Sequence, residues 1–130
     1  MDTNNKYKVL LIEDDKTFID LLRNKCIDAG FDIQVAENGA QGLKLAIESH
    51  PNVIVTDLTM PIMDGFEFLK QLREDSWGKK VPVIILSNYG DFDRISKALD
   101  IGAFYYLVKS DVEPKDVLSY IEKAIKESLM

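Results

Sequence analysis

Acidic, hydroxyl and ammonium groups follow four short apolar runs in this chain of 130 residues. They are Glu13, Asp14, Asp15, Asp57, Ser87 and Lys109. Carboxylates that share one pocket repel each other, so they must take up protons or bind a cation. Oxygen ligands without histidine or cysteine favour a hard cation, Mg²⁺ above all. The residue types therefore indicate a magnesium site in which Ser87 and Lys109 could donate hydrogen bonds to a phosphate.

Asp57 could itself be the reacting group, because an aspartate carboxylate can attack phosphorus and form an aspartyl-phosphate. Phosphoryl transfer depends mainly on positioning and on neutralisation of charge, and this set of side chains offers both. Simpler explanations exist for single residues. The acids at 13–15 could complement the dipole of a following helix, Asp15 could be only a helix cap, and Ser87 could be a loop hydroxyl.

Five apolar runs must position these groups, at residues 7–12, 31–36, 53–56, 81–86 and 103–108. Most are continuous, which is typical of strands covered on both faces, whereas the second alternates and resembles an edge strand. Helical spacing of apolar residues lies between and after the runs, with caps at Asn38 and Asp64 and with Pro114 in the first turn of the last helix. Five strand–helix repeats predict an α/β fold with a five-stranded parallel sheet and helices on both faces. In such a sheet ligands bind at the carboxyl ends of the strands, where the candidate residues would converge.

Composition narrows the class of protein. The length predicts a single domain over residues 1–130, without linker or repeat. A net charge of -6 argues against a nucleic-acid partner, which would require a basic face. No apolar run approaches the roughly 20 residues that span a bilayer, and the polar N-terminus has no signal peptide. The lone Cys26 suits a reducing compartment, so we expect a cytoplasmic protein without a membrane partner.

Four stretches, "VLLIEDD", "VTDLTMPIMDG", "VIILS" and "YYLVKS", resemble the signature stretches of response-regulator receiver domains of two-component signalling. The resemblance covers essentially the whole chain. It implies a flavodoxin-like, doubly wound (βα)5 fold with strand order 2-1-3-4-5. Because no output domain is expected, the chain resembles the stand-alone, chemotaxis-type members.

The resemblance also implies a role for each site residue. Asp57 would accept the phosphoryl group and, with Asp14 and the backbone carbonyl of Thr59, bind Mg²⁺, with Glu13 helping through water. Ser87 would hydrogen-bond the phosphoryl group and Lys109 would pair with it and, at rest, with Asp57. Ser87 and Tyr106 would form the switch. A histidine kinase or phosphotransfer protein would be the donor, and an unknown output protein would bind a face made of residues 91–99, Tyr106 and the last helix. The resemblance implies a regulator rather than an enzyme, and we expect a monomer or weak dimer.

Two other functions remain open from the sequence. A phosphatase of the haloacid dehalogenase type also uses a strand-ending aspartate, Mg²⁺, a hydroxyl and a lysine, but it carries a second aspartate where this chain has Thr59. The other open function is that of a receiver-like interaction module that is never phosphorylated. A nucleotide-binding site is not expected, because no glycine-rich loop follows any strand.

The chain departs from the family pattern at three places. Asn88 stands where a small alanine is usual, and the bulky Tyr89, with Thr59, occupies a position that tunes loss of the phosphoryl group. Ser110 replaces a proline that usually follows the lysine through a cis peptide. Because a non-proline cis bond costs about 2.5–4 kcal/mol, we predict a trans peptide between Lys109 and Ser110.

Overall fold

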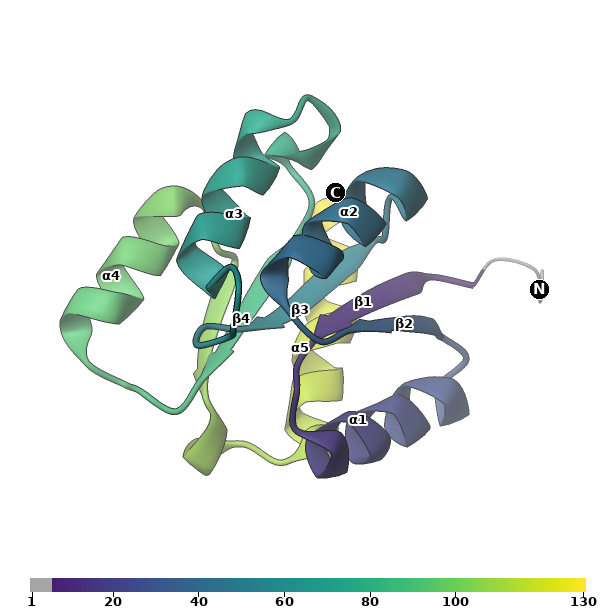
Figure 1. Ribbon diagram of the computed structural model, residues 1–130. Coiled ribbons are helices and arrows are strands. Elements are labelled where there is room, and N and C mark those ends of the chain that lie inside the picture. The colour runs from purple at the N-terminus through teal and green to yellow at the C-terminus, as the bar shows by residue number, and fades with distance from the viewer. Residues whose placement is uncertain (1–5) are drawn as a thin grey trace.

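The computed structural model describes residues 6–130 and shows a five-stranded sheet between two layers of helices (Figure 1). The strands are β1 (Lys8–Ile12), β2 (Asp32–Ala36), β3 (Val53–Asp57), β4 (Val83–Ser87) and β5 (Tyr105–Val108). The helices are α1 (Lys16–Asp28), α2 (Gly39–Ser49), α3 (Gly65–Glu74), α4 (Phe92–Ile101) and α5 (Pro114–Ser128). Two short 3₁₀ turns, η1 (Trp77–Lys79) and η2 (Lys109–Asp111), precede β4 and α5.

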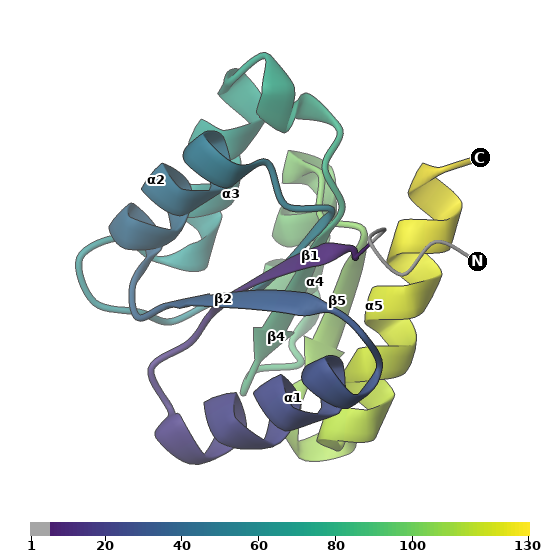
Figure 2. The same ribbon diagram turned by 90° about the vertical axis from the view of Figure 1, so that its right-hand side faces the viewer.

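All neighbouring strands are parallel, in the order β2-β1-β3-β4-β5. Helices α1 and α5 cover one face of the sheet and α2, α3 and α4 cover the other (Figure 2). The predicted fold and strand order are therefore confirmed. β3 and β4 are buried along their whole length, which explains their continuous apolar sequence. β2 alternates between exposed and partly buried residues, as the predicted edge strand should.

The strand bounds differ from the apolar runs in a way that matters for the site. β3 includes Asp57 and β4 includes Ser87, so both side chains are held by the sheet itself rather than by the loops that follow. The fifth run begins too early, because the Ala103 amide still donates to the Ala98 carbonyl at the end of α4. α4 ends at Gly102, whose φ of +115° favours glycine.

Side-chain caps start the helices next to the site. Asp15 accepts hydrogen bonds from the Thr17 and Phe18 amides at the start of α1, so it caps this helix. Asp64 caps α3 through the Glu67 amide. These caps fix where each helix leaves the carboxyl edge of the sheet.

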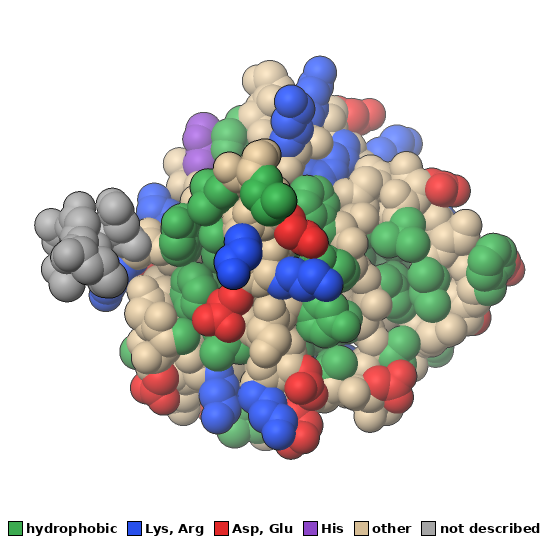
Figure 3. Space-filling model, turned by 180° about the vertical axis from the view of Figure 1, so that it is seen from behind, with side chains coloured by type: hydrophobic (Ala, Val, Ile, Leu, Met, Phe, Trp, Pro, Cys, Tyr) green, Lys and Arg blue, Asp and Glu red, His purple; other side chains and the backbone are tan. Residues whose placement is uncertain are grey.

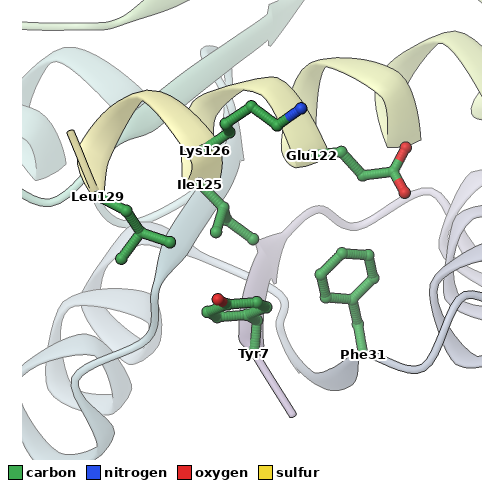
Figure 4. Close-up of a pocket in the computed structure, with 6 residues that line it drawn as sticks. All are labelled: Tyr7, Phe31, Glu122, Ile125, Lys126 and Leu129. Atoms are coloured by element: carbon green, nitrogen blue, oxygen red, sulfur yellow. The ribbon is translucent and has the colours of Figure 1, made fainter. Parts of the chain in front are cut away.

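A groove of about 280 Å³ lies at the opposite, amino-terminal edge of the sheet (Figure 4). Tyr7 and Phe31, which precede β1 and β2, face Ile125 and Leu129 at the end of α5. The groove is thus remote from the candidate site. Among residues 6–130, no helix combines the length and the apolar character needed to cross a membrane.

Candidate functional site

Three carboxylates gather at the carboxyl edge of the sheet. Glu13 and Asp14 follow β1 directly, and Asp57 is the last residue of the neighbouring strand β3. One oxygen from each lies within 4.8 Å of the others. Glu13 and Asp57 are buried, with 1% and 7% of their surface exposed, whereas Asp14 is open to solvent. The predicted convergence of these acids is present in the structure.

Lys109 extends from the end of β5 into this acidic cluster, beside the ring of Phe18. Its Nζ lies 2.7 Å from Glu13 Oε1 and 3.4 Å from Asp57 Oδ2. The sequence predicted a pair with Asp57, so the nearer contact with Glu13 is an addition. Glu13 is the more deeply buried of the two carboxylates, and Asp57 also accepts a hydrogen bond from the Leu58 amide at 2.7 Å, through Oδ1.

The charges in the cluster do not balance, because three carboxylates face one ammonium. Burial raises the pKa of Glu13, the contact with Lys109 opposes this, and the nearby charge of Asp57 raises the pKa further. Burial alone would lower the pKa of Lys109, but its contacts with Glu13 and Asp57 outweigh that effect and raise the pKa. The raised pKa of Glu13 is thus due first to burial, whereas that of Lys109 is due to its two carboxylate neighbours.

Ser87 and Tyr106 lie on adjacent strands and are linked through Tyr89, which the sequence placed only at a position that tunes loss of the phosphoryl group. Ser87, at the end of β4, has 1% of its surface exposed, and its Oγ accepts a hydrogen bond from the Tyr89 amide at 3.0 Å. The Tyr106 hydroxyl on β5 donates to the Tyr89 carbonyl at 2.6 Å. The Tyr89 backbone therefore joins the two predicted switch residues.

In the loop after β3, the backbone at Gly65 packs closely against the backbone at Asp57 and Leu58. The Gly65 amide donates to the Leu58 carbonyl, and a Cβ on Gly65 would lie 2.6 Å from the Asp57 carbonyl oxygen. Only glycine fits there, which explains the "DG" at the end of the signature stretch. Thr59 is exposed in this loop, two residues beyond Asp57, where its backbone carbonyl was expected to help bind a metal.

The peptide between Lys109 and Ser110 is trans, as predicted, since residues 6–130 contain no cis peptide bond. The lysine is the first residue of η2, so the chain turns immediately after it and Ser110 is exposed. Replacement of the proline thus leaves the ammonium pointed at the carboxylates.

The sequence profile of the response regulator receiver domain matches residues 9–122. This chain belongs to that family. The probable transcriptional regulator ycf29 of Pyropia yezoensis is 34% identical over 125 residues, which cover 95% of this chain and 55% of the relative. The DNA-binding dual master transcriptional regulator RpaA of Synechocystis is 36% identical over 107 residues, which cover 82% of this chain and 44% of the relative. The chain spans about half the length of the curated relatives it matches.

Solved structures of receiver domains agree with the assignment. The chemotaxis response regulator CheY4 of Vibrio cholerae superimposes with a TM-score of 0.85 at 28% identity, covering 92% of this chain and 99% of the other. The receiver domain of the Francisella response regulator 1452 gives a TM-score of 0.86 at 31% identity, covering 95% and 99%. Receiver domains are phosphoacceptors of two-component signalling, so this receiver domain is a phosphorylation-controlled switch and not an enzyme.

The acidic cluster of this receiver domain fits the Mg²⁺ that receiver domains typically use. All of its candidate side-chain ligands are carboxylate oxygens, the type that Mg²⁺ prefers. The cluster carries more negative charge than Lys109 can neutralise. A divalent cation would offset this deficit.

Proposed function

We propose that Asp57 is the phosphoacceptor of this receiver domain and that a histidine kinase or phosphotransfer protein is the donor. The observation that carries the proposal is the position of the Asp57 carboxylate. It ends a buried strand within the acidic cluster, and Lys109 Nζ is 3.4 Å from its Oδ2. The Leu58 amide holds Oδ1, so the orientation of the carboxylate is fixed before reaction.

The proposed reaction requires one bond to form and one to break. A carboxylate oxygen of Asp57 attacks phosphorus, and the bond between phosphorus and the donor's histidine nitrogen breaks, leaving the electron pair on that nitrogen. Lys109 then lies near the new phosphoryl oxygens and neutralises part of their charge. The Ser87 hydroxyl, at the end of the neighbouring strand β4, is positioned to donate to the same group.

We further propose that Asp14, Asp57 and the Thr59 backbone carbonyl bind Mg²⁺ directly and that Glu13 binds it through water. The ion supplies charge neutralisation for the incoming phosphoryl group. The contact between Glu13 and Lys109 suggests a second role for Glu13, in which the Glu13 carboxylate orients the Lys109 ammonium.

The output follows from the link through Tyr89. When Ser87 Oγ turns toward the phosphoryl group, its hydrogen bond with the Tyr89 amide is disturbed, and the Tyr89 carbonyl that accepts from Tyr106 moves with it. We propose that an output protein reads this change on the face formed by α4, Tyr106 and α5. Seen from the α5 side, acidic and basic side chains intermingle there with hydrophobic ones (Figure 3). The mixed surface suits a protein partner, and the net charge of -6 keeps nucleic acid outside the proposal.

The test is phosphorylation by acetyl phosphate with and without Mg²⁺, followed by intact mass. We expect a gain of one phosphoryl group only with Mg²⁺, no gain in Asp57→Asn, and an unchanged gain in Asp28→Asn, an exposed aspartate on α1. A gain that persists in Asp57→Asn would show that another residue is the acceptor. Nothing in the described residues favours the phosphatase alternative, because the residue two positions beyond Asp57 is Thr59.

A further inference from the structure

Tyr89 is restrained both through its backbone, which contacts the switch residues, and through its ring, which does not. Its backbone bonds Ser87 and Tyr106, as described above. Tyr89 is 47% exposed. Its ring lies under the guanidinium of Arg94, with 4.2 Å between Arg94 Cζ and the ring centroid. This is a cation–π contact between the loop after β4 and the first turn of α4.

Arg94 is itself fixed to the start of α4. Its Nη1 lies 2.6 Å from Asp91 Oδ1, and its backbone amide donates to Asp91 Oδ2 at 3.2 Å. Asp91 is the N-cap of α4, so a single carboxylate caps the helix and orients the guanidinium. The hydrogen bond from Arg94 lowers the pKa of Asp91, as expected for a carboxylate that is kept ionised.

The surrounding loop has little else to restrain it. Residues 88–94 are all exposed, and Gly90 within this segment adds backbone freedom. Exposed segments with few packed side chains open locally at low free-energy cost. The Arg94 stack is thus a restraint on the Tyr89 backbone in addition to its hydrogen bonds with Ser87 and Tyr106.

Arg94 also faces the reacting edge of the sheet. It lines a hollow of about 380 Å³ together with Leu58 and Thr59, the two residues that follow Asp57. Arg94 therefore borders both loops of the site, the loop after β3 across this hollow and the loop after β4 through Tyr89.

We propose that Arg94 is a positioning residue of the switch: by stacking on Tyr89, it holds the two peptide units on either side of this residue, one bonded to Ser87 and the other to Tyr106. The part of this inference that concerns phosphorylation rests on the proposed role of Asp57. Without the stack, the Tyr89 backbone samples other positions, and Tyr106 loses a fixed acceptor. Because exposed cation–π contacts are weak, the effect on this equilibrium is roughly two- to five-fold.

The experiment compares Arg94→Met with Lys97→Met. Lys97 is the matched control, because it lies on the same helix and its Nζ makes the same kind of contact, 4.2 Å from the ring centroid of Phe66, away from Tyr89. In unphosphorylated protein, hydrogen exchange at the Tyr89 amide and the ring signals of ¹³C-labelled Tyr106 are measured by NMR. We expect Arg94→Met to speed exchange roughly two- to five-fold and to shift the Tyr106 signals, with Arg94→Lys restoring part of both and Lys97→Met changing neither.

The outcomes separate this inference from the proposed function. Equal behaviour of Arg94→Met and Lys97→Met at Tyr89 and Tyr106 would overturn the role of Arg94, whatever the result of phosphorylation. Acetyl phosphate with Mg²⁺ is then added, and the change in the Tyr106 signals should be smaller in Arg94→Met than in the wild type at equal phosphoryl content. A wild type that takes up no phosphoryl group would overturn the proposal for Asp57 but leave the first comparison decisive.

Discussion

At the scale of single residues, the site is a set of charges that the protein alone does not neutralise. Lys109 divides its contacts between Glu13 and Asp57, and Asp14 has no ammonium within ion-pair distance among the described residues. The cluster is thus arranged for a cation that binds the folded chain. Binding to the folded state alone raises stability by about 2.7 kcal/mol when the ligand is at 100 times its dissociation constant.

We therefore predict that Mg²⁺ raises the thermal unfolding midpoint and that Asp14→Asn removes most of this gain. Without Mg²⁺, the variant should be at least as stable as the wild type, because one of three repelling carboxylates has become neutral. Thermal unfolding across a Mg²⁺ titration checks both halves. Asp28→Asn is the control for an exposed aspartate, and an equal gain in wild type and Asp14→Asn would show that the ion binds elsewhere.

Ile62 is strained at the rim of the same site. Its φ is 72°, a left-handed conformation that β-branched residues rarely adopt, and its side chain is 82% exposed, so no burial offsets the cost. Asparagine tolerates this conformation. Ile62→Asn should raise the free energy of unfolding by about 1 kcal/mol, whereas Ile62→Val, which keeps the branch, should leave it nearly unchanged. Urea denaturation measures both, and a destabilised Ile62→Asn would mean that the isoleucine makes contacts that outweigh its strain.

At the scale of elements, one partly buried cation connects α3 with η1, with the segment before β4 and with the end of α4. Arg73 on α3 donates to the carbonyls of Gly78, Val81 and Gly102, at 2.8, 2.7 and 2.6 Å. Gly102 ends α4, so the guanidinium also meets the negative end of that helix dipole. Burial lowers the pKa of Arg73, yet arginine stays charged because its ordinary value is so high.

Arg73→Met should lower the free energy of unfolding by about 2–3 kcal/mol, because three partly buried carbonyls lose a charged donor. Arg73→Lys should recover only part of this, since an ammonium cannot reach three carbonyls as the planar guanidinium does. Urea denaturation gives the magnitude, and hydrogen exchange at the end of α4 shows where the loss falls. The control is Arg23→Met, which removes an exposed ion pair with Asp20. An equally small loss of unfolding free energy in Arg73→Met would show that its three carbonyl contacts do not stabilise the fold.

The elements also show what could be predicted from sequence and what could not. Apolar runs and capping residues predict the strands, the helices and the place where Asp57, Ser87 and Lys109 meet, because these depend on local periodicity and on the parallel topology. The contacts of Arg73 with three carbonyls and of Arg94 with the Tyr89 ring leave no such signal in the sequence. A charged residue on an amphipathic helix has the same pattern whether its side chain meets water or a distant carbonyl. The partner of Lys109 likewise depends on how deeply Glu13 is buried, which a motif does not encode.

At the scale of the whole molecule, each face of the sheet packs its own hydrophobic core. Helices α2, α3 and α4 cover one core, and α1 and α5 cover the other. Cys26 is fully buried in that core, between α1 and the sheet. Its thiol therefore reports on opening of the molecule rather than on chemistry.

Burial, with a smaller contribution from the charge of Glu122, raises the pKa of Cys26 to about 11. A thiol with that pKa is ionised in roughly one molecule in 10,000 at pH 7, and the thiolate is the species that reacts. We predict that a thiol reagent modifies Cys26 only when the fold opens, so the reaction rate should follow the population of opened molecules. Mg²⁺ should slow the modification as far as it stabilises the fold, and Asp14→Asn should remove most of that effect. Because the folded state holds the Cys26 proton more tightly than the unfolded state does, the stability also depends on pH. The contribution of the protonated thiol to the free energy of unfolding is present below pH 9 and is lost as the pH rises toward 11. Rapid modification at pH 7 that ignores both urea and Mg²⁺ would show that the thiol is reached without opening the core.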